Sequence, residues 1–144
     1  MSSEQAAAAA AAASTSDAVT DMLARGLVRP LDASTADEFL AGDGLQVLFF
    51  TGGKSHMRDA HDVAVALREL LRDYRGMVAA AMVSGDGDAL LARFRVSVLP
   101  SLVLVLGGET LEILPRVRDW ADYAGAFRRY LGAPRSTSSA EVLS

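Results

Sequence analysis

A glycine-rich segment, residues 51–55, has the residue types of a phosphate-binding loop. It reads Thr-Gly-Gly-Lys-Ser and follows an apolar run that is typical of a strand. A full P-loop needs a further glycine five residues before Gly53, because backbone amides along the whole loop cradle the phosphates. That position is Leu48, inside the predicted strand. We therefore interpret the segment as a turn between a strand and a helix, with Lys54 in solvent.

The sequence has few histidine side chains that could bind a metal ion and no side chain that could act as a thiol. The chain contains 2 histidines and no cysteine, so it has neither a disulfide framework nor thiolate ligands for a metal. His56 and His61 lie about 140° apart around a helix, so they cannot jointly bind one ion from that helix. We predict no metal site and no cofactor.

The length and composition are those of one soluble domain. The chain has 144 residues, of which 51% are hydrophobic and 22% charged, and single domains commonly have this size. A net charge of −4 without a basic cluster argues against nucleic-acid binding. The longest apolar runs are far shorter than the ~20 residues of a membrane helix. We expect neither nucleic-acid binding nor direct membrane insertion.

The two ends of the sequence differ from its centre. Residues 1–16 are rich in alanine without an amphipathic stripe, and residues 134–144 have lost all periodicity. We expect a single domain over residues 17–133 between two flexible tails. A secretory signal is disfavoured, because no Lys or Arg precedes Arg25 and alanine is only weakly apolar.

Hydrophobic periodicity predicts alternating strands and helices. Continuous apolar runs at residues 45–50 and 77–83 are typical of buried parallel strands, and the helical stripe over 56–74 connects them. The fold class is therefore α/β. The remaining predicted helices span residues 17–25, 34–40, 88–94 and 119–131; the remaining strands span 102–106 and 110–114, with a further short strand as an option near 27–31.

Local signals refine the ends of these elements. Ser34 and Thr35 precede acids at capping-box spacing, and Asp119 is placed to cap the last helix. Residues 107–109, Gly-Gly-Glu, indicate a tight hairpin. The last helix carries an apolar stripe that we interpret as core, since aromatic residues at helical spacing are more often core than a partner site. The stripe consists of Trp120, Tyr123, Ala124, Phe127, Tyr130 and Leu131.

The predicted topology brings several loops to one end of the sheet. Ligands of open α/β sheets usually bind where the carboxyl ends of strands converge. We expect a binding groove at this end, lined by loops that follow or precede the predicted strands. The candidate groove residues are Gly53, Lys54, Ser55, His56, Met57, Asp86, Asp88, Leu99, Pro100, Arg116 and Arg118.

The order of elements resembles the thioredoxin fold over residues 27–131. The most specific stretch is 93–102, Arg-Phe-Arg-Val-Ser-Val-Leu-Pro-Ser-Leu, followed by Gly-Gly-Glu at 107–109. In thioredoxins the matching proline is cis, and the backbone of the residue before it pairs with an extended peptide. The resemblance implies a cis Leu99–Pro100 bond and a central mixed sheet flanked by helices on both faces.

The same resemblance shows where this chain departs from thioredoxins. Residues 54–57 read Lys-Ser-His-Met where thioredoxins have Cys-Gly-Pro-Cys, and Leu48 stands where they carry a buried carboxylate. Disulfide exchange needs a thiolate, and the hydroxyl of Ser55 neither ionises near neutral pH nor forms a stable mixed disulfide. We therefore predict a protein that is not an enzyme and that binds an extended peptide by strand addition.

The whole chain more closely resembles the cysteine-free assembly proteins of uptake nickel–iron hydrogenases, the HyaE/HupG/HoxO type. The resemblance is carried by the order and spacing of short segments. These are Met-Leu-Ala-Arg-Gly at 22–26, Phe49-Phe50, Arg-Phe-Arg-Val at 93–96, Pro100 and Asp-Trp-Ala at 119–121. It implies a cytoplasmic maturation chaperone that binds the hydrogenase small-subunit precursor before export, including its twin-arginine signal peptide, together with other maturation proteins as further partners.

An arginine pair in that signal peptide would need carboxylates on its receptor. The nearest candidates on this layout are Asp59, Asp86, Asp88 and Asp119. Lys54, Arg58, Arg116 and Arg118 share the same end, so the groove is not plainly acidic. The alternative function is a redox-inactive thioredoxin-like scaffold that binds another protein through the same groove or through an oligomer interface.

Overall fold

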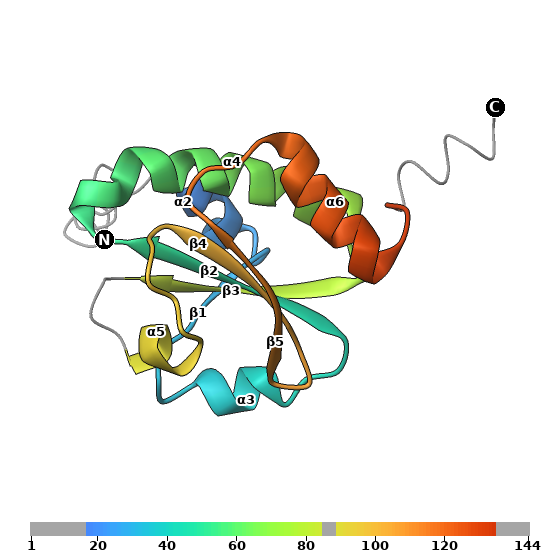
Figure 1. Ribbon diagram of the computed structural model, residues 1–144, viewed down its shortest axis with the longest axis horizontal. Helices are drawn as coiled ribbons and strands as arrows, with labels where there is room; N and C mark the ends of the chain where they lie inside the picture. The colour runs from blue at the N-terminus through green and yellow to red at the C-terminus, as the bar shows by residue number, and fades with distance from the viewer. Residues whose placement is uncertain (1–16, 85–88, 135–144) are drawn as a thin grey trace.

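A five-stranded mixed sheet forms the centre of the protein in the computed structural model, which describes residues 17–84 and 89–134 (Figure 1). Strands β1, β3 and β2 run parallel to one another, whereas β4 and β5 are each antiparallel to the strand before them in the sheet. The predicted sites Asp86 and Asp88 lie outside the described residues, as do residues 1–16 and 135–144 of the predicted tails. In sheet order, the strands are β1 (Arg29–Pro30), β3 (Val78–Ser84), β2 (Leu45–Gly52), β4 (Ser101–Leu106) and β5 (Glu109–Pro115).

Helices cover both faces of this sheet, as predicted (Figure 1). Three helices pack against one face: α2 (Asp17–Ala24), α4 (Met57–Asp73) and α6 (Trp120–Leu131). Two shorter helices pack against the other: α3 (Ala36–Leu40) and α5 (Ala89–Arg93). The predicted α/β class is confirmed, and the arrangement is the thioredoxin-like one that the resemblance implies.

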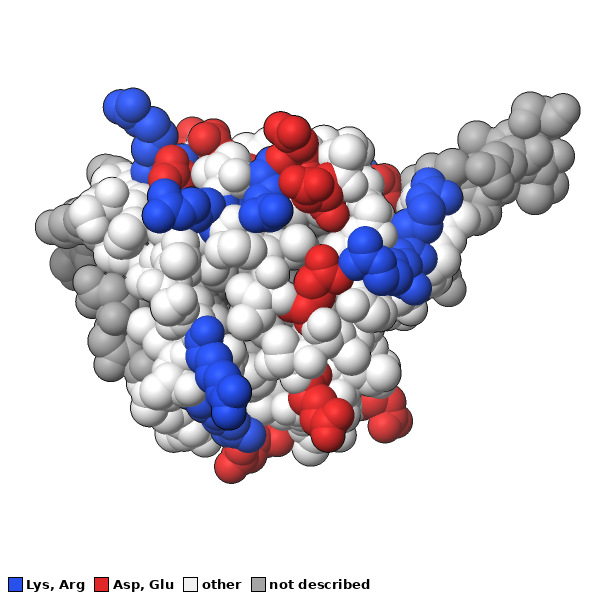
Figure 2. Space-filling model, viewed as in Figure 1, with Lys and Arg blue, Asp and Glu red and all other residues white. Residues whose placement is uncertain are grey.

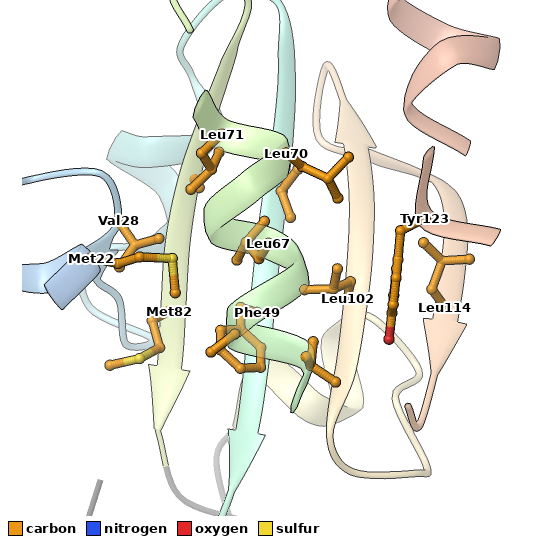
Figure 3. Close-up of a cluster of buried hydrophobic side chains, with 14 of the residues drawn as sticks. Met22, Val28, Phe49, Leu67, Leu70, Leu71, Met82, Leu102, Leu114 and Tyr123 are labelled. Carbon is orange, nitrogen blue, oxygen red and sulfur yellow. The ribbon is translucent and has the colours of Figure 1, made fainter. Parts of the chain in front are cut away.

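Strand β2 separates two hydrophobic clusters. Its residues Leu45 to Phe50 are all buried, which confirms the central strand predicted from this run, apolar at every position except Gln46. Because side chains alternate along a strand, Phe49 joins the cluster under α2, α4 and α6, whereas Leu48 and Phe50 join the cluster over α3 and α5. Figure 3 shows Phe49 in the first cluster with Leu67 of α4 and Leu102 of β4.

Helix α4 follows β2 with its apolar stripe against the sheet. Its observed bounds are Met57–Asp73, within one residue of the predicted ends, and a 3-10 turn, η1 (Lys54–His56), precedes it. Ala60, Val63 and Leu67 on the stripe are buried. The structure therefore places η1 and then the first turn of α4 after the carboxyl end of β2.

Both predicted helix caps are wrong. Thr35 occupies the N-cap position of α3 and Asp119 that of α6, but neither side chain makes a capping hydrogen bond. Before α3, the carboxylate of Asp32 accepts hydrogen bonds from the backbone amides of Ser34, at 2.9 Å, and Thr35, at 3.1 Å. The hydrogen bonds from Ser34 are the main cause of a lowered pKa of Asp32. An Asx turn therefore takes the amides that a capping box would have used.

Strands β4 and β5 form the predicted hairpin. Gly107 and Gly108 have φ values of 61° and 82°, and positive φ at both central residues suits the two-residue turns that connect antiparallel strands. Glu109 begins β5 opposite Leu106 instead of belonging to the turn. The optional strand near residues 27–31 is present only as the short edge strand β1, which pairs with β3.

Candidate partner-binding surface

One end of the sheet brings most of the predicted groove residues together. Phe50, near the end of β2, faces Val83 of β3 on one side and Ser101 of β4 on the other. Ser101 in turn faces Pro115, the last residue of β5. The loops next to these strand ends therefore lie at the same edge of the fold. We call the following set the sheet-end surface: residues 52–57, 99–100 and 115–120.

The bond between Leu99 and Pro100 is cis, as the resemblance implies. The carbonyl of Pro100 accepts a hydrogen bond from the backbone amide of Arg116 at 2.8 Å, and the Ser101 hydroxyl donates to the carbonyl of Val98 at 2.6 Å. Between these two bonds, no hydrogen bond among the described residues engages the backbone amide or carbonyl of Leu99. Its side chain packs against the cluster over α3 and α5. Leu99 thus offers a free backbone pair to an extended segment.

The segment that would carry the redox motif is a short turn packed against the end of β2. Gly53 accepts a hydrogen bond from the backbone amide of His56 at 3.0 Å. The imidazole of His56 covers Gly52, whose φ is 81°. Ser55 is exposed and Met57 is half-buried. Because β2 continues through Gly52, the residues from Leu48 to Gly52 are strand, which excludes the long amide cradle of a P-loop.

Replacing Gly52 with Ala is expected to lower the free energy of unfolding by about 2–4 kcal/mol. The positive φ alone costs a residue with a Cβ about 1–2 kcal/mol, and displacing a packed neighbour adds a cost of similar size. A Cβ at Gly52 would lie 2.9 Å from the His56 ring. Gly26 is the matched control, because its φ is 69° and no atom lies within 4 Å of its added Cβ. Urea unfolding measures both variants, and equal losses would contradict the contact with His56.

The side chain of Tyr123 is hydrogen-bonded to the backbone of the loop between β5 and α6. Its buried hydroxyl accepts a hydrogen bond from the backbone amide of Arg118 at 3.0 Å and donates to the carbonyl of Arg116 at 3.3 Å. Burial is the largest influence on the pKa of Tyr123 and raises it, whereas the bond from Arg118 lowers it. Arg116 has a φ of 62°, which is uncommon for a residue other than glycine. These contacts hold the loop in one conformation beside Pro100.

Val117 lies in the predicted groove loop between Arg116 and Arg118, whereas Trp120 was predicted to belong to the core. Their exposed fractions are 42% and 47%, so the prediction that Trp120 is core is wrong. Burial along α6 begins at Tyr123 and includes Phe127, as predicted. Trp120 is the first residue of the helix and follows an exposed loop. The other members of the predicted stripe, Ala124, Tyr130 and Leu131, are half-buried.

The charges around the sheet-end surface are of both signs. Arg116 and Arg118 are exposed, and so are Asp119 and Asp122. The Arg118 guanidinium lies 3.4 Å from the Asp122 carboxylate. Asp59, a candidate carboxylate at the start of α4, is also exposed. Figure 2 shows basic and acidic side chains interspersed with uncharged surface on the face that it views. Neither sign dominates.

Other features of the described residues lie apart from this surface. A depression of about 340 Å³ adjoins the last turns of α4, where Asp21 pairs with Arg25 at 2.8 Å and with Arg68 at 3.4 Å. The depression is lined by Arg25, Leu27, Arg68, Arg72 and Arg75.

Within residues 17–84 and 89–134, no group of three or more potential ligand side chains is placed to bind a metal ion. In the same ranges no helix has the length and apolar character needed to cross a membrane.

Comparison with known proteins identifies the family. Residues 18–123 match the family model described as hydrogenase-1 expression protein HyaE. The hydrogenase expression/formation protein HupG of Bradyrhizobium diazoefficiens is 37% identical over 125 residues, which cover 83% of this chain and 84% of the relative. HupG of Rhizobium leguminosarum bv. viciae is 38% identical over 106 residues, covering 70% and 71%. HoxO of Cupriavidus necator is 32% identical over 129 residues, covering 85% and 80%. The predicted resemblance is confirmed, and the chain belongs to the HyaE family.

Proposed function

We propose that this protein acts in hydrogenase expression and formation as a non-catalytic chaperone for the small-subunit precursor of an uptake nickel–iron hydrogenase. It binds the precursor in the cytoplasm before export, and the bound region includes the twin-arginine signal peptide. Family membership supports the general role, because the relatives at 32% to 38% identity are named hydrogenase expression/formation proteins. The contact with the precursor is the finer step of the proposal.

The free backbone of Leu99 is the observation that carries this finer step. An extended peptide gains affinity by adding main-chain hydrogen bonds to an unpaired backbone, and neighbouring side chains supply specificity. The neighbours at this point are Pro100 and the loop that begins at Arg116, which a hydrogen bond connects to Pro100. A signal peptide is a suitable occupant because it has no folded structure that would compete for its own backbone groups.

The chemistry of the redox position supports binding without turnover. The chain has no cysteine at any position, so it cannot form the thiolate or the mixed disulfide through which thioredoxins act. Ser55 stands in the exposed part of η1, where its hydroxyl has no hydrogen bond that would activate it among the described residues. Turnover of a disulfide substrate by the purified protein would contradict this part of the proposal.

A pull-down with the purified protein as bait is expected to retain the full-length small-subunit precursor. Retention should fall by about 10-fold or more when the signal peptide is removed, since that change removes the segment proposed to pair with Leu99. The large subunit of the same hydrogenase and an unrelated exported precursor serve as controls.

Two results would contradict the proposal in different ways. Absence of both forms of the small subunit from the bound fraction would remove the small subunit as the partner. Equal capture of the unrelated precursor would favour the alternative function, a redox-inactive scaffold without a dedicated hydrogenase partner.

A further inference from the structure

Val117 and Trp120 are two exposed apolar side chains, three residues apart, that closely follow the residue hydrogen-bonded to Pro100; we call them the apolar pair. Both side chains are more than two-fifths exposed, at 42% and 47%. Tryptophan is highly buried on average, and large aromatic side chains left open to water are enriched where partners bind. The backbone bond from Arg116 to Pro100 joins the loop of this pair to the residue next to Leu99.

The pair is held in place before any partner arrives. The Tyr123 hydroxyl bonds to the backbone on both sides of Val117, at Arg116 and at Arg118. Trp120 lies at the start of α6, one turn before the buried Tyr123. A partner that contacts this pair therefore loses little free energy to ordering of the loop, which favours affinity.

The charges on residues 116–122 determine which kind of partner peptide can bind there. Arg116 and Arg118 contribute two cations, and Asp119 and Asp122 contribute two carboxylates, so the segment is neutral as a whole. One cation and one carboxylate already pair, between Arg118 and Asp122 at 3.4 Å. A basic segment gains no net attraction here, whereas an uncharged apolar one buries Val117 and Trp120 without stripping water from a charge of its own.

We infer that Val117 and Trp120 receive the uncharged apolar stretch of the precursor's signal peptide, in extended form, and that the arginine pair of that peptide lies beyond this patch. The inference rests on the proposed function and goes further by naming which part of the signal peptide is read and by which side chains. It assigns Trp120 as the main anchor, because its ring offers the larger apolar area.

The protein's own fluorescence tests this directly, because Trp120 is its only tryptophan. Titration with a tryptophan-free synthetic signal peptide should shift the emission of Trp120 to shorter wavelength and reduce its quenching by acrylamide. A peptide with its arginine pair changed to glutamine should bind within about 3-fold of the original. A peptide with alternate apolar residues changed to serine should bind at least about 10-fold more weakly.

Variants of the protein locate the contact. Trp120→Ala should weaken binding of a dye-labelled signal peptide by about 10- to 100-fold, and Val117→Ser by a smaller factor. Leu106→Ala is the matched control, since Leu106 is 48% exposed at the hairpin end of β4, opposite the sheet-end surface. Thermal unfolding of each variant checks that the fold is intact. We expect little change in unfolding temperature, because these side chains are already exposed to solvent.

The outcomes separate this inference from the proposed function. Wild-type affinity of Trp120→Ala, or loss of binding with the arginine-substituted peptide alone, would overturn the assignment even if the precursor itself is still captured. Failure of both the peptide and the full precursor to bind would overturn the proposed function and the inference with it. A shifted emission together with the loss in Trp120→Ala, and none in Leu106→Ala, supports both.

Discussion

Replacing Leu48 with Asp is expected to remove most or all of the folded protein at neutral pH. Leu48 is fully buried in the cluster over α3 and α5, and it faces Ala81 and Val103 on the neighbouring strands. Complete burial raises the pKa of a carboxyl by up to about 3–5 units, so the ionised form costs about 4–7 kcal/mol. Single domains are stable by only about 5–15 kcal/mol. Thioredoxins, which this chain resembles, carry a buried acid at this position.

The effect should depend on pH in a defined direction. An Asp at position 48 has a higher pKa in the folded protein than the value of about 3.9 in the unfolded chain. The unfolded chain therefore loses its proton first, and stability falls as pH rises from about 4 toward the folded-state pKa, by about 1.4 kcal/mol per unit. Urea unfolding at pH 4 and pH 7.5 should show Leu48→Asp as much the less stable at the higher pH.

Two control variants separate charge from polarity and from volume. Leu48→Asn has nearly the same shape as Asp but does not ionise, so its loss should be the same at both pH values. Leu48→Ala leaves a cavity and should cost about 2–5 kcal/mol independently of pH. Equal stability of the Asp and Asn variants at pH 7.5 would contradict the argument, because it would mean that water or a cation reaches position 48.

The sequence predicted the parts of the fold that depend on long, regular patterns. Leu45 to Phe50 read as a strand covered on both faces because every residue is apolar except Gln46, and burial follows that pattern. Gln46 is buried as well, and its amide nitrogen donates to the carbonyl of Phe39. That bond joins β2 to α3 across a turn, so no periodicity in the sequence could indicate it.

Short-range signals were less reliable because other groups compete for the same atoms. The carboxylate of Asp32 accepts hydrogen bonds from the backbone amides of Ser34 and Thr35, which the acids three residues further on would have accepted in a capping box. The first turn of α6 extends beyond the buried part of the helix, so Trp120 kept the helical period of a core residue without the burial. Period indicates which face of a helix is apolar, but it does not indicate where along the helix the core begins.

The convergence of the candidate site was predictable from topology, whereas its details were not. Parallel and antiparallel pairing dictates that the ends of β2, β4 and β5 meet. The exposure of Val117 and the free backbone of Leu99 depend on tertiary contacts, above all on those of Tyr123 with the loop at Arg116 and Arg118. Tyr123 was assigned to the core, and the structure gives its hydroxyl this additional contact.

Tyr123→Ala is expected to be the second most damaging of these substitutions, with a loss of about 3–5 kcal/mol in the free energy of unfolding. Tyr123 is 1% exposed and one of the largest fully buried side chains, and removing an aromatic ring from a core leaves a cavity of that cost. Tyr123→Phe keeps the ring and loses only the hydroxyl. It should cost about 1–2 kcal/mol, because water can replace part of the lost hydrogen bonding at the exposed loop.

The Phe variant should also weaken precursor binding, which links the core residue to function. Without the hydroxyl, the backbone on both sides of Val117 is free to move, and ordering it again lowers affinity. Phe127→Leu is the matched control, since Phe127 lies one turn further along α6, is fully buried, and should lose a similar free energy of unfolding, about 1–1.5 kcal/mol. Equal binding by the two variants would show that the hydroxyl contributes to stability alone.

Alkaline pH offers an independent measure of the same contact. Burial raises the pKa of Tyr123 above that of an unfolded tyrosine, so the phenol loses its proton at lower pH in the unfolded chain than in the folded one. The stability that depends on the protonated phenol is complete below about pH 10 and is lost as pH rises toward the folded-state pKa. Tyr74 also has a raised pKa, mainly through burial, but it is present in both proteins and cancels in their comparison. The stability advantage of the wild type over Tyr123→Phe should therefore shrink between pH 9 and pH 11, whereas an advantage constant over that range would mean that the hydroxyl is reached by water.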